Sequence, residues 1–237
     1  IYRDFAVQYS QRSMGADVLT IDYRVAPKHP FPCALEDAVT AYQWLMKEKN
    51  YRASDIVVAG DSAGGGLALA LVMYLRDHAL PLPAGVLVMS PWADLTCSGE
   101  SHETNFHRDP QFGGTIDNML HNSSYIGDAD PHAPYLSPMF GDFTDFPPTL
   151  IQVGSEEVLL SDSLTVAQKL REAHRKLRIS VYDGMFHVFQ MALRLIPESR
   201  EAWEEAGRFL EIVYGVERTE EGRKVRLVRS NRKRKKR

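Results

Sequence analysis

Hydrophobic positions along the chain follow two periodicities. Short apolar runs predict buried strands, which cover residues 16–22, 56–59, 85–89, 149–153 and 178–182. Apolar positions three and four residues apart predict helices over residues 3–14, 34–47, 63–76, 116–125, 161–173 and 198–214. Alternating strands and helices, with strands apolar along nearly their whole length, are typical of a parallel sheet covered on both faces. The pattern therefore predicts an α/β fold with five strands in a mostly parallel sheet.

The overall composition fits one globular domain. The chain has 237 residues, of which 44% are hydrophobic and 10% aromatic, which excludes collagen, a coiled coil and a wholly disordered protein. No run approaches the roughly 20 apolar residues of a membrane-spanning helix. Two cysteines are too few for a disulfide framework. Reduced thiols are typical of the cytoplasm, and we expect a cytoplasmic protein without a membrane span.

The charge is unevenly distributed. Residues 218–237 carry eleven Lys and Arg against two acids, and because the whole chain has a net charge of −3, the remainder carries −12. We expect a folded domain over residues 1–216 and a basic, disordered tail over residues 217–237, which has almost nothing apolar to bury. The alternative is a tail that binds nucleic acid or an anionic membrane. The acidic body argues against a nucleic-acid-binding domain.

One motif follows the predicted strand at 56–59 directly. Residues 60–64 read GDSAG, a G-x-S-x-G motif between a strand and a helix. In this context the motif forms a sharp turn that exposes the serine Oγ at the carboxyl end of the sheet, where ligands bind. Ser62 is therefore the candidate nucleophile, and the N–H of Ala63 is the candidate oxyanion donor. The alternative is a glycine-rich turn that packs a helix on a strand, with Ser62 as its cap.

A serine nucleophile needs a base. In this arrangement the partners follow in the order serine, acid, histidine. His174 lies among charged residues at the end of a polar helix and is interpreted as a surface residue. His187 follows the last predicted strand, where a loop can carry its imidazole to Ser62. His187 is therefore the candidate base.

The acid must accept the Nδ1 proton of the histidine. It is expected after the strand at 149–153, where Glu156, Glu157 and Asp162 occur. Glu157 is preferred, with Glu156 as the alternative acid and Asp162 third, although residue order barely separates the first two.

Other chemistry finds little support. No Cys/His spacing resembles a zinc site, and the Gly64-Gly65-Gly66 run lacks the Lys-Ser/Thr of a phosphate-binding loop. We expect neither a metal nor a cofactor. The irregular stretch at 94–147 and the strand end before it supply candidates for an apolar pocket wall, namely Trp92, Phe106, Phe112, Met119 and Tyr125.

Several segments occur together in one order. They read DYRVAP at 22–27, PFP at 30–32, EDA at 36–38, GDSAGG at 60–65, SPWADL at 90–95 and GMFHVF at 184–189. In this order they resemble the hormone-sensitive-lipase-like α/β-hydrolases, which include the bacterial family IV esterases, over roughly residues 1–214. The resemblance implies an α/β-hydrolase fold and cofactor-free ester hydrolysis, with Ser62 as nucleophile, His187 as base and Glu157 at the place of an acid that is usually Asp.

One family segment is missing from this sequence. The family has an upstream HGGG whose glycine N–H groups form most of its oxyanion hole, and no such segment occurs here. By family spacing it would precede Ile1. We therefore expect an α/β-hydrolase domain that lacks its N-terminal strands and cap helices, with reduced activity in the chain as given.

These observations predict a serine hydrolase that cleaves carboxylic esters of short to medium acyl chains through an acyl-serine intermediate. Its expected partner is a small-molecule ester and not a nucleic acid, and assembly as a homodimer stays open. One alternative is an amidase or deacetylase with the same triad. The other is a non-catalytic binding protein that keeps the fold.

Overall fold

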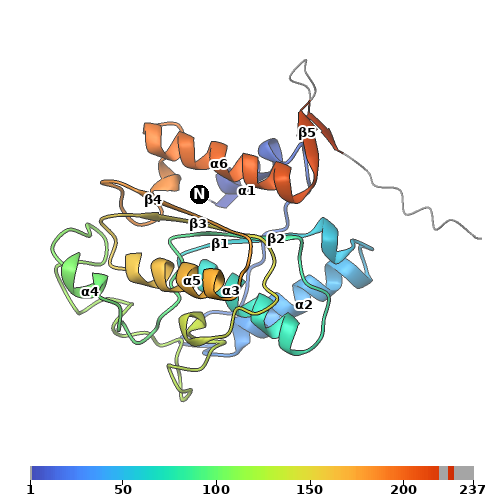
Figure 1. Ribbon diagram of the computed structural model, residues 1–237. Helices are drawn as coiled ribbons and strands as arrows, with labels where there is room; N and C mark the ends of the chain where they lie inside the picture. The colour runs from blue at the N-terminus through green and yellow to red at the C-terminus, as the bar shows by residue number, and fades with distance from the viewer. Residues whose placement is uncertain (1, 219–223, 227–237) are drawn as a thin grey trace, which may run out of the picture.

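The fold is built around a sheet of four parallel strands (Figure 1). The computed structural model describes residues 2–218 and 224–226. The strands are neighbours in chain order, namely β1 (Val57–Asp61), β2 (Gly85–Met89), β3 (Thr149–Gly154) and β4 (Leu177–Tyr182). The central strands β2 and β3 are buried along their whole length, whereas β1 and β4 are partly exposed. This burial explains why the central strands read as continuous apolar runs.

Helices cover both faces of the sheet. One face carries α2 (Cys33–Lys47), α3 (Ala63–Asp77) and α5 (Leu160–Glu172), and the other carries α1 (Tyr2–Arg12) and α6 (Pro197–Val213) (Figure 1). Side chains alternate along β2, so that Val86 and Val88 join the core beneath α3 and α5 while Leu87 joins the core beneath α6. Within residues 2–218 and 224–226, no helix is both long enough and apolar enough to cross a bilayer.

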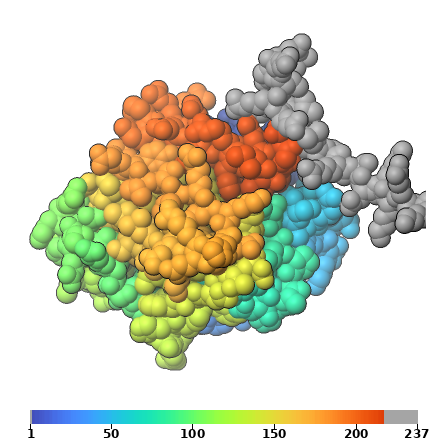
Figure 2. Space-filling view, viewed as in Figure 1, coloured from blue at the N-terminus to red at the C-terminus, as the bar shows by residue number. Residues whose placement is uncertain are grey.

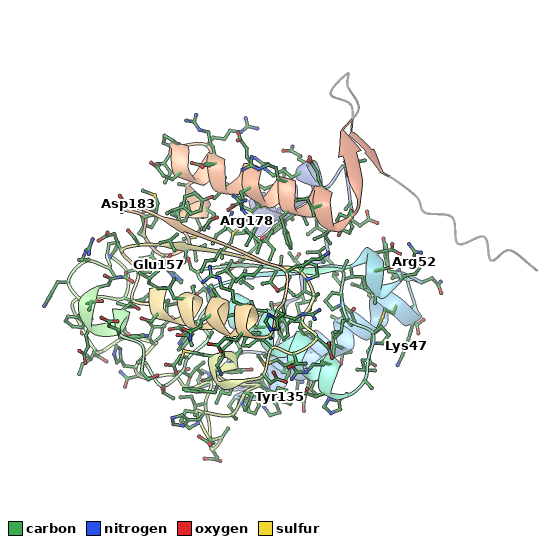
Figure 3. The ribbon with its side chains drawn as sticks, viewed as in Figure 1. Lys47, Arg52, Tyr135, Glu157, Arg178 and Asp183 are labelled. Carbon is green, nitrogen blue, oxygen red and sulfur yellow. The ribbon has the colours of Figure 1, made fainter. Side chains whose placement is uncertain are left out.

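A buried carboxylate ties α6 to the sheet. Glu205 accepts hydrogen bonds from Gln152 on β3 (2.8 Å), from Ser180 (2.7 Å) and from Arg178 on β4. Figure 3 shows Arg178 between the sheet and α6. Burial by itself raises the pKa of Glu205, but the hydrogen bonds from Ser180, Gln152 and Arg178 outweigh burial and hold this pKa below its usual value.

The strand predicted at 16–22 is wrong. This segment forms neither a helix nor a strand and pairs with none of the described strands, so the described sheet has four strands and not five. Val18, Leu19 and Ile21 are exposed. A cavity of about 250 Å³ lies between residues 16–20, α1 and β1, and it separates the segment from the edge of the sheet. An apolar run forms a strand only where a neighbouring backbone can pair with it.

The helix predicted at 116–125 is also wrong, because that stretch forms turns. Asn118 Oδ1 accepts a hydrogen bond from the Leu120 N–H (2.9 Å), and its Nδ2 donates to the Phe112 and Thr115 carbonyls (2.9 and 2.8 Å). An asparagine that binds nearby backbone groups competes with helix formation. The loop between β2 and β3 contains instead the short helix α4 (Ser101–Thr104) and the 3-10 turn η2 (Pro138–Phe140). Two further 3-10 turns, η1 (Ala53–Asp55) and η3 (Phe189–Ala192), lie elsewhere in the chain.

The predicted tail over 217–237 falls largely outside the described residues. At the predicted boundary, β5 (Val216–Arg218) pairs antiparallel with β6 (Lys224–Arg226), a pairing that the composition did not predict. The division of the chain into a domain over 1–216 and a separate tail stays a proposal.

Candidate active site

The turn that joins β1 to α3 has an unusual backbone. Ser62 adopts φ 53° and ψ −124°, a region that costs a non-glycine residue about 1–3 kcal/mol. Four backbone hydrogen bonds hold this conformation. The Ser62 N–H donates to the Met89 carbonyl (3.0 Å), and the Ser62 carbonyl accepts from the N–H groups of Gly65, Gly66 and Trp92 (3.0, 3.1 and 2.9 Å). The surrounding structure therefore compensates for the strain at the candidate nucleophile.

Two glycines permit the close approach of strand and helix. A Cβ on Gly60 would lie 2.2 Å from the Gly64 carbonyl oxygen, and a Cβ on Gly66 would lie 2.1 Å from the Trp92 carbonyl oxygen. Neither position can hold a side chain without moving the backbone. By contrast, a Cβ on Gly64 would meet nothing within 4 Å.

Three of the predicted side chains form one hydrogen-bonded series. Ser62 Oγ lies 2.9 Å from His187 Nε2, and His187 Nδ1 lies 2.9 Å from Glu157 Oε2. His187 is 4% exposed and Glu157 is fully buried. Figure 3 shows Glu157 near the end of the sheet where β3 and β4 finish. Because an ionised carboxylate only accepts hydrogen bonds, Nδ1 carries the proton and Nε2 is free to accept from the serine hydroxyl.

The second oxygen of Glu157 is also satisfied. Glu157 Oε1 accepts hydrogen bonds from Ser90 Oγ (2.7 Å) and from the Gly154 N–H (2.6 Å). Ser90 Oγ in turn accepts from the Val188 N–H (3.1 Å), next to the histidine. These groups stabilise a buried carboxylate and fix its position. Sequence reasoning assigned no role to Ser90, although its place directly after β2 was a usable signal.

The loop that carries the acid is held from a distant segment. Asn105 Nδ2 donates to the carbonyls of Ser155 and Glu157 (3.0 and 2.8 Å). Asp109 Oδ2 accepts from the Val158 N–H (2.9 Å). Both holding residues follow α4 and had no recognisable sequence signal.

The other two candidate acids lie elsewhere. The Glu156 carboxylate pairs with Arg108 at the surface. Asp162 is fully buried, and its Oδ2 accepts from the N–H groups of Ala93 and Asp94 (both 2.8 Å). Of the three, the structure brings Glu157 to His187.

The residue before the serine carries a further charge. Burial raises the pKa of the Asp61 carboxyl, while the nearby His187 and a hydrogen bond from the Tyr2 hydroxyl (3.5 Å) oppose this effect. Asp61 therefore lies within electrostatic range of the histidine.

A cavity of about 250 Å³ opens beside Ala63, the first residue of α3. A first-turn N–H has no acceptor within its helix, so the Ala63 N–H is available to an oxyanion. Three of the expected wall residues, Trp92, Met119 and Tyr125, line this cavity. Of the other two, Phe112 lies edge-on to the His187 ring at 4.9 Å, and Phe106 contacts His107.

The DYRVAP and EDA segments meet at one ion pair. Arg24 Nε donates to both Asp37 carboxylate oxygens (3.0 Å each), and Nη2 donates to Asp37 Oδ1 (2.8 Å) and to Glu36 (3.0 Å). Arg24 lines the same cavity as Ala63. The two segments thus anchor one wall of the cavity on α2.

Comparisons with known proteins agree with this geometry. The chain matches a family described as alpha/beta hydrolase fold over residues 3–191. An acetyl-hydrolase of Streptomyces hygroscopicus is 44% identical over 201 residues, covering 85% of this chain and 67% of the relative. An esterase of Acinetobacter venetianus is 36% identical over 192 residues, covering 81% of this chain and 63% of the relative.

Solved structures give the same result. The crystal structure of an esterase from the bacterial hormone-sensitive lipase family has a TM-score of 0.81 and 38% identity, over 86% of this chain and 68% of the other. An esterase/lipase from an uncultured bacterium has a TM-score of 0.84 and 37% identity, over 90% and 71%. The chain spans about two thirds of the length of the curated relatives named above.

Proposed function

We propose that this chain, which belongs to the α/β-hydrolase fold family, is a serine hydrolase of carboxylic esters. The fold and the family resemblance predicted from the sequence are confirmed. The names of the relatives, esterase and acetyl-hydrolase, support ester hydrolysis. The observation that carries the proposal is the hydrogen-bonded series from Ser62 Oγ through His187 to Glu157.

The mechanism follows from the proton positions. His187 Nε2 takes the proton of Ser62 as Oγ attacks the ester carbonyl carbon, and the Ala63 N–H donates to the oxyanion that forms. Glu157 holds the histidine tautomer and stabilises the imidazolium. The imidazolium then protonates the departing alcohol, which leaves an acyl-serine. A water molecule that loses its proton to His187 hydrolyses this intermediate and restores the enzyme.

The cavity supports short to medium acyl chains as substrates. Its volume of about 250 Å³ lies near the lower end of ligand pockets, and Trp92, Met119 and Tyr125 give it an apolar wall. A small-molecule ester with an acetyl or butyryl group fits this description better than a long-chain lipid.

The test replaces Ser62 by Ala and measures hydrolysis of p-nitrophenyl acetate together with labelling by a fluorophosphonate probe. We expect turnover to fall by about 10³-fold or more and the label to disappear. The exposed Ser54 provides the matched control, and Ser54→Ala should behave like the wild type. Hydrolysis and labelling that survive in Ser62→Ala would show that Ser62 is not the nucleophile.

Removal of an acetyl group from an amine is a second candidate. The name of the acetyl-hydrolase relative favours an acetyl substrate, and the same triad can attack an amide. Comparing kcat/KM for matched O-acetyl and N-acetyl compounds separates the two reactions.

The cellular location and the oligomeric state of the protein are two further proposals. Both cysteines, Cys33 and Cys97, are free thiols, which supports the predicted cytoplasmic location. Assembly as a homodimer stays a prediction, to be measured by sedimentation.

A further inference from the structure

Three potential metal ligands converge beside α5. One ligand atom from each of Cys97, His102 and His121 lies within 4.8 Å of the other two. Four residues lie between Cys97 and His102 and eighteen between His102 and His121, which is not a zinc-site spacing, so the sequence predicted no metal. The turns at 105–121 bring the ring of His121 back to that of His102 in α4, with 6.2 Å between the ring centroids.

His102 is the unusual member of this group. Its side chain is only 5% exposed, and neither ring nitrogen has a hydrogen-bond partner. Asp162 Oδ1 pairs with His102 Nε2 at 3.7 Å but makes no hydrogen bond, since the hydrogen bonds of this carboxylate are made by Oδ2. Buried polar atoms without partners are uncommon and costly, and they indicate a missing ion or water.

The other two residues are arranged as ligands. The Cys97 thiol donates to the Leu120 carbonyl (3.4 Å), which places its sulfur in the loop of His121. His121 Nδ1 lies 3.1 Å from Asn118 Oδ1. Because an amide oxygen only accepts, Nδ1 carries the proton, and the lone pair of Nε2 is free for a metal.

We propose that Cys97, His102 and His121 bind one zinc ion. Asp162 acts as the carboxylate that orients His102 through Nε2, leaving Nδ1 for the metal, an arrangement common around zinc-bound histidines. One thiolate and two imidazoles are donors that zinc prefers, with a water molecule as the fourth ligand.

The three ligand atoms must move slightly closer together to bind one ion. Bond lengths of about 2.0–2.3 Å in a tetrahedron place ligand atoms roughly 3.3–3.8 Å apart. His121 is exposed, so rotation of its side chain can supply this movement without disturbing the core.

Zinc at this position would fasten the turn of His121 to α4 and to the residues after β2. Ser101, next to His102, already bonds to the Val158 carbonyl through its Oγ, and Asn105 holds the Glu157 carbonyl. Figure 2 shows the green segment that contains α4 along one side of the molecule. An ion shared by Cys97, His102 and His121 would therefore stabilise the folded chain by holding the His121 turn to α4, which is already bonded to the body.

The experiment measures metal in the full chain. Purified protein is dialysed against zinc, its metal content is measured by mass spectrometry, and Co²⁺ is then titrated as a spectroscopic probe. We expect about one zinc per chain, a Co²⁺–thiolate charge-transfer band, and a zinc-dependent rise in Tm. Cys97→Ser should abolish the band, and His121→Ala should weaken zinc binding by more than tenfold.

Matched variants decide whether the assignment holds. Cys33→Ser and His132→Ala alter the other cysteine and an exposed histidine elsewhere, and both should bind zinc like the wild type. Asp162→Asn should weaken binding by about 10–100-fold. The proposal is wrong if wild-type protein retains no zinc and shows no charge-transfer band, or if the band persists in Cys97→Ser. Since His121 is exposed, unchanged zinc affinity in a folded His121→Ala variant would also overturn it.

Discussion

Replacing Glu157 by Gln changes the shape of the site little, but it changes which nitrogen of His187 carries the proton. The carboxylate accepts from Ser90 and Gly154 through Oε1 and from His187 through Oε2. A glutamine offers one accepting oxygen and one donating amide nitrogen. If the oxygen takes the place of Oε1, both of its donors stay bonded. The reverse orientation would set the amide NH₂ against the Gly154 N–H, so the first orientation is favoured.

In the favoured orientation the amide NH₂ donates to His187 Nδ1. That nitrogen must then be unprotonated, and the proton moves to Nε2, which faces Ser62 Oγ. This tautomer cannot accept the serine proton. The corresponding change in the serine protease triad lowers kcat about 10⁴-fold by the same tautomer effect. We therefore expect Glu157→Gln to lower kcat by about 10³–10⁴-fold, or about 4–5 kcal/mol in the barrier, with little change in KM.

The assay is the initial rate of p-nitrophenyl acetate hydrolysis over a range of substrate concentrations, with circular dichroism to verify folding. Glu156→Gln is the control, because that carboxylate pairs with Arg108 at the surface, and its kcat should stay within about threefold of the wild type. If a folded Glu157→Gln variant keeps kcat within tenfold, or if Glu156→Gln loses as much, the tautomer argument fails.

Three further outcomes are expected. Gly66→Ala should lower the free energy of unfolding by about 1–3 kcal/mol, because its Cβ would meet the Trp92 carbonyl at 2.1 Å. Gly64→Ala is the control, since its Cβ has open space and should not lower this free energy, and equal Tm values for the two variants in thermal melts would contradict the prediction. Ser90→Ala should lower kcat by about tenfold at constant KM, since it removes a donor to the acid, and a loss of stability with unchanged kcat would rule out a positioning role. Because the folded pKa of Glu205 is lowered, its contribution to stability is present above its unfolded value of 4.5 and is lost as the pH falls through the folded pKa. Urea unfolding of Glu205→Gln between about pH 6 and pH 3 should therefore show a weaker pH dependence than the wild type, and parallel curves would refute the assignment.

The local elements were determined by contiguous residues. The helix at 63–77 and the strands at 85–89 and 149–154 lie where apolar periodicity and apolar runs predict them, because these patterns are properties of contiguous residues. The glycines around Ser62 likewise specify a sharp turn through sterics alone. For the same reason the sequence sufficed to name Ser62 and His187 as candidates, each in the turn or loop that follows a strand.

Tertiary structure decided what depends on partners far along the chain. Residues 16–22 have the composition of a strand but no described backbone to pair with, and the turns around Asn118 replaced a helix that periodicity favoured. Glu156 and Glu157 are adjacent and chemically alike, so only the position of the histidine loop distinguishes them. The convergence of a cysteine and two histidines beside Asp162 could likewise not be predicted from the sequence. Periodicity reports which way neighbouring side chains point, whereas the meeting of distant groups depends on packing that no single segment specifies.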